Sequence, residues 1–297
     1  MQGSETDLPL LPTTRRRFIR LAAAAGVAAL AVDSTLIEPN RPQIVRREIA
    51  LRRWPARLEG FTIAVLSDFH YDPHFSIHPL RSAIGMVNGL HPELIVLAGD
   101  FVSVPLFGDA AAAASAAEPC AQLLRQMQAP HGLWAVMGNH DCFTDSDHVT
   151  SALRAEGIQV LSNQSVAIER DGDGGGRFWL AGVDDVLCGG ADLAASLHNV
   201  PADEASVLLA HEPDYADYVA RFPVDLQISG HSHGGQVRAP LVGPVFLPAM
   251  AKKYIWGLYK IGGLTLYTNP GLGTVNVPVR WNCPPEITLL TLRRAVG

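Results

Sequence analysis

Short apolar segments recur along the chain between residues 61 and 229, and polar residues follow each of them at once. Five of these segments have the length of a buried strand: Phe61–Leu66, Leu94–Ala98, Leu133–Met137, Val207–Ala210 and Leu226–Ser229. Continuous apolar segments of this length are typical of strands that are buried on both faces of a sheet. Helical spacing of apolar residues is found between them, at about residues 79–89, 119–128 and 146–156. This alternation predicts an α/β fold, formed as one domain over residues 48–297.

Each predicted strand ends in side chains that commonly bind metal ions. The residues that follow the five strands are Asp68 and His70, then Asp100, then Asn139, His140 and Asp141, then His211, and finally His231 and His233. In α/β folds, ligands bind beyond the carboxyl ends of the strands, where such side chains meet. Gly99, Gly138 and Gly230 suit sharp turns at three of these ends. The five ends together predict a polar site at one edge of the fold.

This ordered set resembles the calcineurin-like metallophosphoesterase superfamily over about residues 48–292. The matching motifs are Asp68-x-His70, Gly99-Asp100, Gly138-Asn139-His140-Asp141, His211 and Gly230-His231-x-His233. Residues 230–238, 269–273 and 284–288 are similar to the YkuE-like branch of that superfamily. The resemblance implies a four-layer α-β-β-α sandwich, in which two facing sheets are flanked by helices.

The resemblance also implies two divalent metal ions and gives each polar residue a role. Asp68, His70 and His233 would hold the first ion, Asn139, His211 and His231 would hold the second, and Asp100 would bridge both. His140 would protonate the leaving oxygen or stabilise charge in the transition state, a contribution of about 10²–10⁴-fold. Asp141 would either fix the tautomer of His140 or cap the helix that follows.

The ligand chemistry indicates the kind of reaction. Imidazole and oxygen ligands without thiolate suit Mn, Fe, Zn or Ni, and disfavour copper(I) and iron–sulfur clusters. Two such ions, about 3.5–4 Å apart, clamp a phosphoryl group and lower the pKa of a shared water, which then attacks as hydroxide. We therefore expect a hydrolase that cleaves phosphodiester or pyrophosphate bonds. A phosphomonoesterase, or a metal-binding envelope protein without catalytic activity, is the alternative.

The first 40 residues differ from the rest of the chain. A basic segment at residues 15–20 precedes an apolar stretch from Leu21 to Leu30, and small residues surround Ala31. This layout is that of a secretory signal, and the paired arginines resemble a twin-arginine export signal. We expect a signal peptide or an uncleaved anchor over residues 1–40, followed by a polar linker to residue 47. An ordinary amphipathic helix is the alternative.

Export through the twin-arginine machinery would place the protein in the periplasm or on the outer face of the cytoplasmic membrane. The formal net charge is −6, and the chain would carry −8 once the basic signal had been removed after Ala31. Nucleic acids require cationic surfaces to neutralise their phosphates. We therefore expect no nucleic-acid partner.

Residues 239–263 are apolar and rich in glycine and proline, and they include Lys252, Lys253 and Lys260. They would form either a β-hairpin packed on the core or a lip that contacts a membrane surface or an acyl chain. The second interpretation favours a lipid-linked phosphate ester. Enzymes related by the resemblance cleave the pyrophosphate of UDP-2,3-diacylglucosamine, but that substrate faces the cytoplasm, in conflict with the predicted export.

The four cysteines show no pairing pattern. Cys142 follows the Gly138–Asp141 motif and is expected to be buried without a partner, and Cys120, Cys188 and Cys283 suggest no pair. The glycine-rich residues 171–177 are expected to form a hairpin turn between strands at Val166–Glu169 and Phe178–Leu180.

Overall fold

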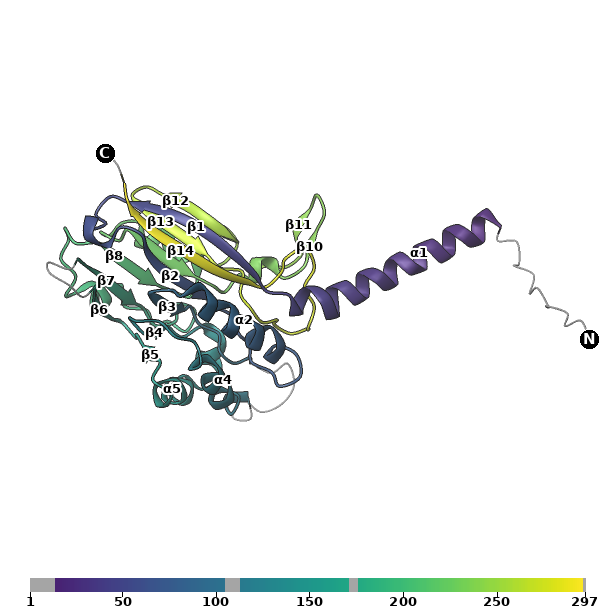
Figure 1. The fold of residues 1–297 in the computed structure, drawn as a ribbon, viewed down its shortest axis with the longest axis horizontal. Helices are drawn as coiled ribbons and strands as arrows, with labels where there is room; N and C mark the ends of the chain where they lie inside the picture. Colours follow the sequence, from purple (N-terminus) through teal and green to yellow (C-terminus); the bar gives the residue numbers. More distant parts are fainter. Residues whose placement is uncertain (1–13, 105–112, 171–175, 296–297) are drawn as a thin grey trace, which may run out of the picture.

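The computed structural model describes residues 14–104, 113–170 and 176–295, which contain two mixed six-stranded sheets (Figure 1). In spatial order, the first sheet contains β1 (Gln43–Leu51), β14 (Glu286–Arg294), β2 (Phe61–Leu66), β3 (Leu94–Leu97), β4 (Leu133–Ala135) and β5 (Gln159–Val160). The second sheet contains β12 (Gly257–Ile261), β13 (Leu264–Thr268), β9 (Leu226–Ser229), β8 (Ser206–Leu209), β7 (Arg177–Gly182) and β6 (Gln164–Glu169). Strands β2 to β5 are parallel to one another, as are β7, β8, β9 and β13.

Helices cover the outer face of each sheet. The first sheet is covered by α2 (Ile77–Leu90), α4 (Ala117–Leu124) and α5 (Asn139–Ala155), and the second by α6 (Leu193–Leu197) and α7 (Ala216–Val219). Three short helices lie in connections: η3 (Ala56–Leu58), η4 (Pro213–Tyr215) and η5 (His233–Gly235). A separate apolar cluster fills the space between the sheets. The predicted four-layer α-β-β-α sandwich is therefore confirmed.

Strand β2 illustrates why these segments are apolar throughout. Ile63 and Val65 point into the core between the sheets, whereas Ala64 and Leu66 point into the core under the helices. Both faces of the strand are removed from water, so the sequence shows no alternation of polar and apolar residues. All five predicted strands are present, with bounds that differ from the predicted ones by at most two residues.

Helix α5 begins earlier than predicted. It starts at Asn139 directly after Gly138, and Asp145 interrupts it with an extended backbone (φ −168°). The Asp145 carboxylate accepts a hydrogen bond from the His148 backbone N–H (3.0 Å), which caps the second segment. The predicted helix at residues 146–156 corresponds to that second segment alone. The first segment places Asn139, His140 and Asp141 in a helical turn at the end of β4.

The predicted linker over residues 40–47 is a strand in the structure. Strand β1 begins at Gln43, pairs in parallel with β14 and places most of its polar side chains in solvent. One long edge strand with only two buried side chains has the polar composition of a linker, so the composition was misleading. The predicted hairpin is confirmed, since β6 and β7 pair antiparallel. Residues 171–175 of its turn lie outside the described residues.

The N-terminal helix α1 (Arg15–Val32) projects away from the sandwich and buries none of its side chains (Figure 1). Two short helices, η1 (Asp33–Ile37) and η2 (Glu38–Asn40), connect it to the domain. Together residues 15–40 form a helical segment of 26 residues that is long and apolar enough to cross a membrane. Length and composition do not separate a signal sequence from an anchor.

Cys142 and Cys188 form a disulfide that joins α5 to the connection after β7. Both residues are half-buried, so the expectation of a buried, unpartnered Cys142 was wrong. The two cysteines are 46 residues apart and belong to elements on different sheets. Only the packing of the two sheets brings them together. Cys120 and Cys283 are buried free thiols.

Candidate metal centre

The ends of five strands bring the predicted ligands to one edge of the sandwich. Asp68 and His70 follow β2, Asp100 follows β3, Asn139 follows β4 at the start of α5, His211 follows β8, and His231 and His233 follow β9. These seven side chains are buried, although none of them is apolar. Both sheets contribute, so the site forms only where their carboxyl ends face one another.

The side chains form two groups that share Asp100. The first group contains Asp68, His70, Asp100 and His233, and the second contains Asp100, His211 and His231. Within each group, one ligand atom from every residue lies within 4.8 Å of the others. The sharing of one carboxylate matches the division into two ions that the family resemblance implied.

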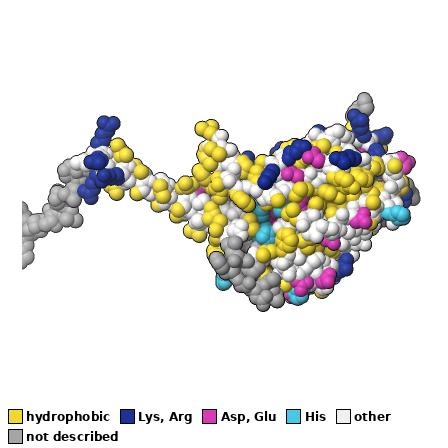
Figure 2. Space-filling view, turned by 180° about the vertical axis from the view of Figure 1, so that it is seen from behind, with side chains coloured by type: hydrophobic (Ala, Val, Ile, Leu, Met, Phe, Trp, Pro, Cys, Tyr) yellow, Lys and Arg dark blue, Asp and Glu magenta, His cyan; other side chains and the backbone are white. Residues whose placement is uncertain are grey.

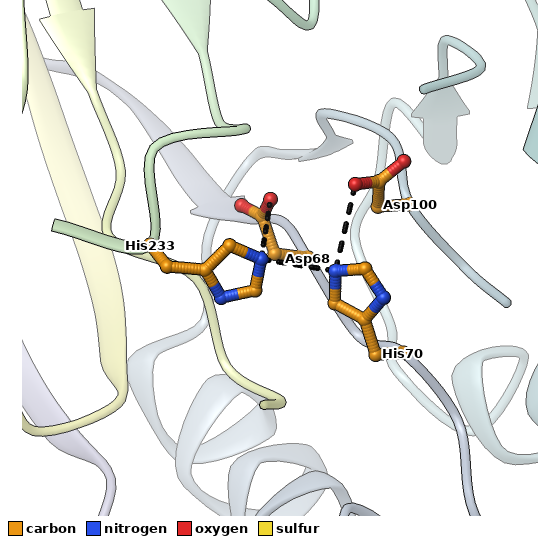
Figure 3. A group of neighbouring side chains, drawn as sticks. All are labelled: Asp68, His70, Asp100 and His233. Carbon is orange, nitrogen blue, oxygen red and sulfur yellow. Dashed lines mark hydrogen bonds and ion pairs between the residues drawn. The ribbon is translucent and has the colours of Figure 1, made fainter. Parts of the chain in front are cut away.

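Figure 3 shows how the first group converges. The Nε2 atoms of His70 and His233 lie 3.0 Å apart. His70 Nε2 is 3.5 Å from an Asp100 oxygen, and His233 Nε2 is 3.5 Å from an Asp68 oxygen. In the second group, His211 Nε2 lies 3.1 Å from the same Asp100 oxygen. The imidazole nitrogens are therefore directed at one another and at carboxylates.

The outer ring nitrogens of three histidines are held by the protein. His211 Nδ1 contacts the Ala98 carbonyl at 2.6 Å, and His231 Nε2 contacts the Ala249 carbonyl at 2.7 Å. His70 Nδ1 lies 2.9 Å from the Ser103 hydroxyl. A carbonyl on the outer nitrogen fixes the proton there and leaves a lone pair on the inner nitrogen, as in metal-ligating histidines. These supporting groups were not predicted, because the sequence does not show where a backbone carbonyl will lie.

Asp68 is held by a second set of polar contacts. Its Oδ1 accepts a hydrogen bond from the His231 backbone N–H (2.9 Å), and its Oδ2 accepts one from the Ser67 hydroxyl. The same hydroxyl lies 3.0 Å from Asn269 Oδ1, and the Gly273 N–H donates to the Asp68 carbonyl (2.7 Å). The segment 269–273, one of the stretches similar to the YkuE-like branch, therefore helps to hold Asp68 in position through Ser67 and the Asp68 backbone.

Burial and charge act in opposite directions on the histidines. Burial, together with nearby His140, lowers the pKa of His70 to about 3, and burial with His211 lowers that of His231 to about 4. Burial also favours neutral His211, but Asp100 overcomes this effect and raises the His211 pKa well above its usual value. Without metal, Asp100 therefore favours a proton on His211, and this proton must leave before His211 Nε2 can bind an ion.

Two observations test whether divalent cations fit here. The Asn139 Oδ1 atom is buried without a hydrogen-bond partner, and it lines the same cavity as Asp100, His231 and His233. The other candidate ligands of the site are imidazole nitrogens and carboxylate oxygens, which suit Mn, Fe, Zn or Ni. Two buried carboxylates also require compensating positive charge. The residues present therefore fit a pair of divalent ions.

Strained backbone is concentrated at these residues. Asp68, His70, Asp100, His231 and His233 all have positive φ, between 41° and 68°. Non-glycine residues rarely adopt this conformation, which costs on the order of 1–3 kcal/mol each when it is imposed by the surroundings. Each strand end therefore turns more sharply than an unstrained chain would, and this turn directs its side chain into the site.

The three flanking glycines have different roles. Gly99 has φ +90°, as expected for a sharp turn, and a side chain there would also meet His211 Nδ1 at 2.6 Å. Gly138 and Gly230 have no unusual φ. A Cβ at Gly230 would lie 2.6 Å from Asp68, and one at Gly138 would overlap Asp100. The need for space beside the carboxylates, rather than a turn, requires glycine at those two positions.

His140 and Asp141 have separate surroundings. The Val104 N–H donates to His140 Nδ1 (2.9 Å), which leaves the proton of the neutral ring on Nε2. Asp141 accepts hydrogen bonds from the backbone N–H groups of Asp100, Phe101, Val102 and Gly138. Of the two roles considered for Asp141, the structure shows the helix cap, and Val104 sets the tautomer of His140.

A cavity of about 510 Å³ gives access to this edge of the site. Its lining includes Asp100, Asn139, His140, His231 and His233. It also includes six apolar side chains: Val237, Val245, Phe246, Pro248, Val275 and Val277. The cavity therefore combines candidate metal ligands with an apolar lining.

Comparison with known proteins identifies the family. The model of the calcineurin-like phosphoesterases matches residues 61–235, which include all seven predicted ligands. The chain belongs to the calcineurin-like phosphoesterase family. It is therefore a hydrolase of phosphoester bonds.

Three relatives in this family align over most of their length. The chain is 34% identical to the uncharacterized metallophosphoesterase YkuE of Bacillus subtilis, over 94% of this chain and 98% of YkuE. It is 33% identical to phosphodiesterase YaeI of Escherichia coli, over 94% and 99% of the two chains. It is 25% identical to UDP-2,3-diacylglucosamine pyrophosphatase LpxG of Chlamydia muridarum, over 86% and 90%.

Replacement of the shared carboxylate tests the arrangement. We expect wild-type protein to bind two Mn²⁺ ions per chain and Asp100→Asn to lose at least one of them, because the amide removes the charge common to both groups. Metal analysis after gel filtration measures the ratio. Asp203 is exposed, and Asp203→Asn makes the same chemical change there. This control variant should bind as many Mn²⁺ ions as the wild type. Two ions retained by Asp100→Asn would contradict the bridging assignment.

Metal affinity should depend on pH through Asp68. Burial raises the pKa of Asp68 to about 7, so the metal-free protein holds a proton there in mildly acidic solution. A ligand must lose its proton to bind a metal, so the Kd for Mn²⁺ should increase more steeply, by about a further tenfold per pH unit, below pH 7 than above it, where Asp68 is ionised and only the proton on His211 still opposes binding. Calorimetric titration between pH 5.5 and 8 measures this dependence. An unchanged slope across pH 7 would show that Asp68 is ionised throughout.

Proposed function

We propose that this protein is an exported phosphodiesterase or pyrophosphatase with a dinuclear divalent metal centre. The observation that supports this proposal is the pair of buried ligand groups that share Asp100 beside the cavity. We assign Asp68, His70 and His233 to the first ion, and Asn139, His211 and His231 to the second. When bound, two such ions polarise a phosphoryl group and lower the pKa of water to generate the nucleophile.

The chain's own residues supply the remaining steps. Asn139 offers a neutral oxygen where a further carboxylate would reduce the positive charge that attracts phosphate. His140 carries its proton on Nε2, because Nδ1 accepts the Val104 N–H, and it is half-buried in the cavity wall. That proton can pass to the leaving oxygen as the phosphorus–oxygen bond breaks. His140 is thus the proposed general acid, and Asp141 holds the backbone on which Asp100 and His140 lie.

The composition of the cavity wall favours a diester over a monoester. A phosphomonoester carries up to two negative charges, which phosphatases neutralise with cationic side chains as well as metal. Among the described residues that line this cavity there is no lysine or arginine, and six of the lining side chains are apolar. A phosphodiester or pyrophosphate with an apolar substituent fits such a cavity better. The names of YaeI and LpxG, a phosphodiesterase and a lipid-precursor pyrophosphatase, agree with this preference.

The site of action is proposed to be the cell envelope. The basic residues 15–20 and the apolar helix that follows support export by the twin-arginine route, with the protein released or anchored on the outer side of the cytoplasmic membrane. The Cys142–Cys188 disulfide is a second indication, because disulfides persist in oxidising compartments such as the periplasm. A lipid-linked or other envelope phosphate ester is therefore the proposed substrate, rather than a cytoplasmic nucleotide lipid.

Two chromogenic esters distinguish the candidate activities. We expect Mn²⁺-loaded protein to hydrolyse bis-p-nitrophenyl phosphate with a kcat/KM about tenfold or more above that for p-nitrophenyl phosphate, since the cavity lacks a cationic clamp for the dianion. Release of p-nitrophenol measures both rates. The reverse preference would favour a phosphomonoesterase. No hydrolysis with Mn, Zn or Fe would favour a metal-binding envelope protein.

Removal of the His140 imidazole should separate catalysis from metal binding. We expect His140→Ala to retain both ions and to lower kcat for the diester by about 10²–10⁴-fold, because a general acid is lost while every proposed ligand stays in place. His148→Ala removes a partly exposed imidazole further along α5 and should leave kcat unchanged. Loss of metal from His140→Ala would mean that the residue acts on the ligands instead.

A further inference from the structure

The short hairpin of β10 (Arg238–Ala239) and β11 (Gly243–Pro244) exposes apolar side chains to solvent. Leu241 is 109% exposed, Val242 is 78% exposed and Phe246 is 69% exposed. Residues 239–248 contain no lysine, arginine, aspartate or glutamate. Figure 2 shows the hairpin as a hydrophobic protrusion on the same side of the molecule as α1. An uncharged protrusion of this kind indicates an interaction surface.

Further exposed apolar residues surround the same end of the domain. Leu36 lies at the end of the helical N-terminal segment, Phe75 precedes α2, and Val277 lies in the connection before β14; all three are more than half exposed. One cavity lies between Leu36, Phe75 and Pro278, and the cavity at the metal centre lies between Val277 and Phe246. We call these six exposed residues the apolar collar: Leu36, Phe75, Leu241, Val242, Phe246 and Val277.

The base of α1 is attached to the base of the hairpin through one short segment. The Arg280 N–H donates to the Ser34 carbonyl (2.9 Å), and the Asn282 N–H donates to the Glu38 carboxylate (2.9 Å). Between these two residues, the Trp281 carbonyl accepts the Arg238 N–H (2.9 Å). The N-terminal segment is thus fixed to the domain where the hairpin begins, without a flexible linker.

This attachment limits where a bilayer can lie. An α-helix rises about 1.5 Å per residue, so the mostly apolar residues that follow the arginines of α1, from Leu21 to Ile37, span about 25 Å, close to the ~30 Å thickness of the hydrocarbon core. If α1 crosses a membrane, the membrane surface lies at the end of the domain that carries the collar. The hairpin, α1 and the metal cavity would then face the same lipid layer.

We propose that the apolar collar is a membrane-docking surface and that the tip of the hairpin, Leu241 and Val242, inserts into the bilayer. A lipid surface is favoured over a protein partner because the collar is continuous with the membrane-length helix and because the tip carries no charged group. The free energy of the system falls when apolar side chains at such a tip enter the membrane interface. Docking itself does not depend on the proposed hydrolysis.

If the proposed function is also correct, docking determines how substrate reaches the site. Val245 and Phe246 follow the hairpin and belong to the apolar lining of the cavity that Asn139 and His140 also line. An amphiphilic phosphodiester in the bilayer could place its apolar part along this lining and its phosphate at the ligands. The substrate class would then be a membrane phospholipid or another lipid-linked phosphodiester.

The depth of the hairpin in a membrane can be measured directly. The full chain carrying Leu241→Cys, labelled with the fluorophore NBD, is reconstituted into vesicles of phosphatidylethanolamine and phosphatidylglycerol. We expect a blue-shifted emission and strong quenching by nitroxide-labelled lipid. Ser151→Cys on α5 is exposed at a distant part of the domain and is the control (Figure 1). The two native free cysteines are buried, so labelling is directed to the introduced thiol.

Two results would overturn the proposal. Equal quenching at Leu241→Cys and Ser151→Cys would show that the tip stays in water. A blue shift without lipid quenching would show that the tip is covered by protein, for example by a second copy of the chain. Neither result depends on turnover, so a failure of docking and a failure of the proposed hydrolysis are distinguishable.

A second variant links docking to turnover. The double variant Leu241→Ser/Val242→Ser should lower the hydrolysis of a phosphodiester lipid embedded in vesicles by about tenfold, because two inserted apolar side chains are lost. Its rate with soluble bis-p-nitrophenyl phosphate should equal that of the wild type, since neither residue lines the metal cavity. Equal rates of wild type and variant on the embedded lipid would contradict a role of the hairpin in substrate access.

Discussion

The burial of two carboxylates is the main energetic constraint at the edge of the sandwich where the candidate metal ligands meet. Asp68 and Asp100 are almost completely enclosed where the two sheets meet, and an uncompensated carboxylate costs several kcal/mol in such surroundings. The imidazoles around them are also buried, which pushes His70 and His231 toward the neutral form. Protons on these two imidazoles therefore do not compensate the carboxylates, whereas divalent cations bind carboxylates and neutral imidazoles at once. The convergence of both sheets follows from this requirement.

The rest of the fold supports that convergence. The three apolar cores hold the strands rigidly, and this rigidity lets five ligand residues keep a left-handed backbone that costs free energy. Gly138 and Gly230 allow the chain to pass directly beside the carboxylates. The Asp141 carboxylate accepts hydrogen bonds from four backbone N–H groups and so holds the turn that contains Asp100 against the start of α5. Stability in the cores thus offsets strain at the site.

The sequence predicted the features that are encoded locally. Apolar segments such as Phe61–Leu66 marked the strands, and the polar residues after them marked the edge where ligands meet. Features that depend on distant segments were missed. Strand β1 has a linker's composition because it lies at an edge, and the Cys142–Cys188 disulfide forms only because two sheets face each other. The tautomer of His140 depends on the backbone N–H of Val104. Almost every residue has such a group, so the sequence does not show which one will lie beside His140.

The cavity offers a substrate two kinds of contact, polar contacts with the candidate metal site and apolar contacts with the rest of the lining. In the proposed mechanism, metal ions and His140 act on the phosphate, where charge changes during the reaction, whereas Val245, Phe246 and Val277 would contact only the part of the substrate that does not react. Binding free energy from such a remote part accelerates the chemical step when it positions the phosphate against the ligands. A small phosphate ester cannot use the apolar lining. An ester with a long apolar substituent can, so the proposed site would select for an apolar substituent in addition to the single negative charge of a diester.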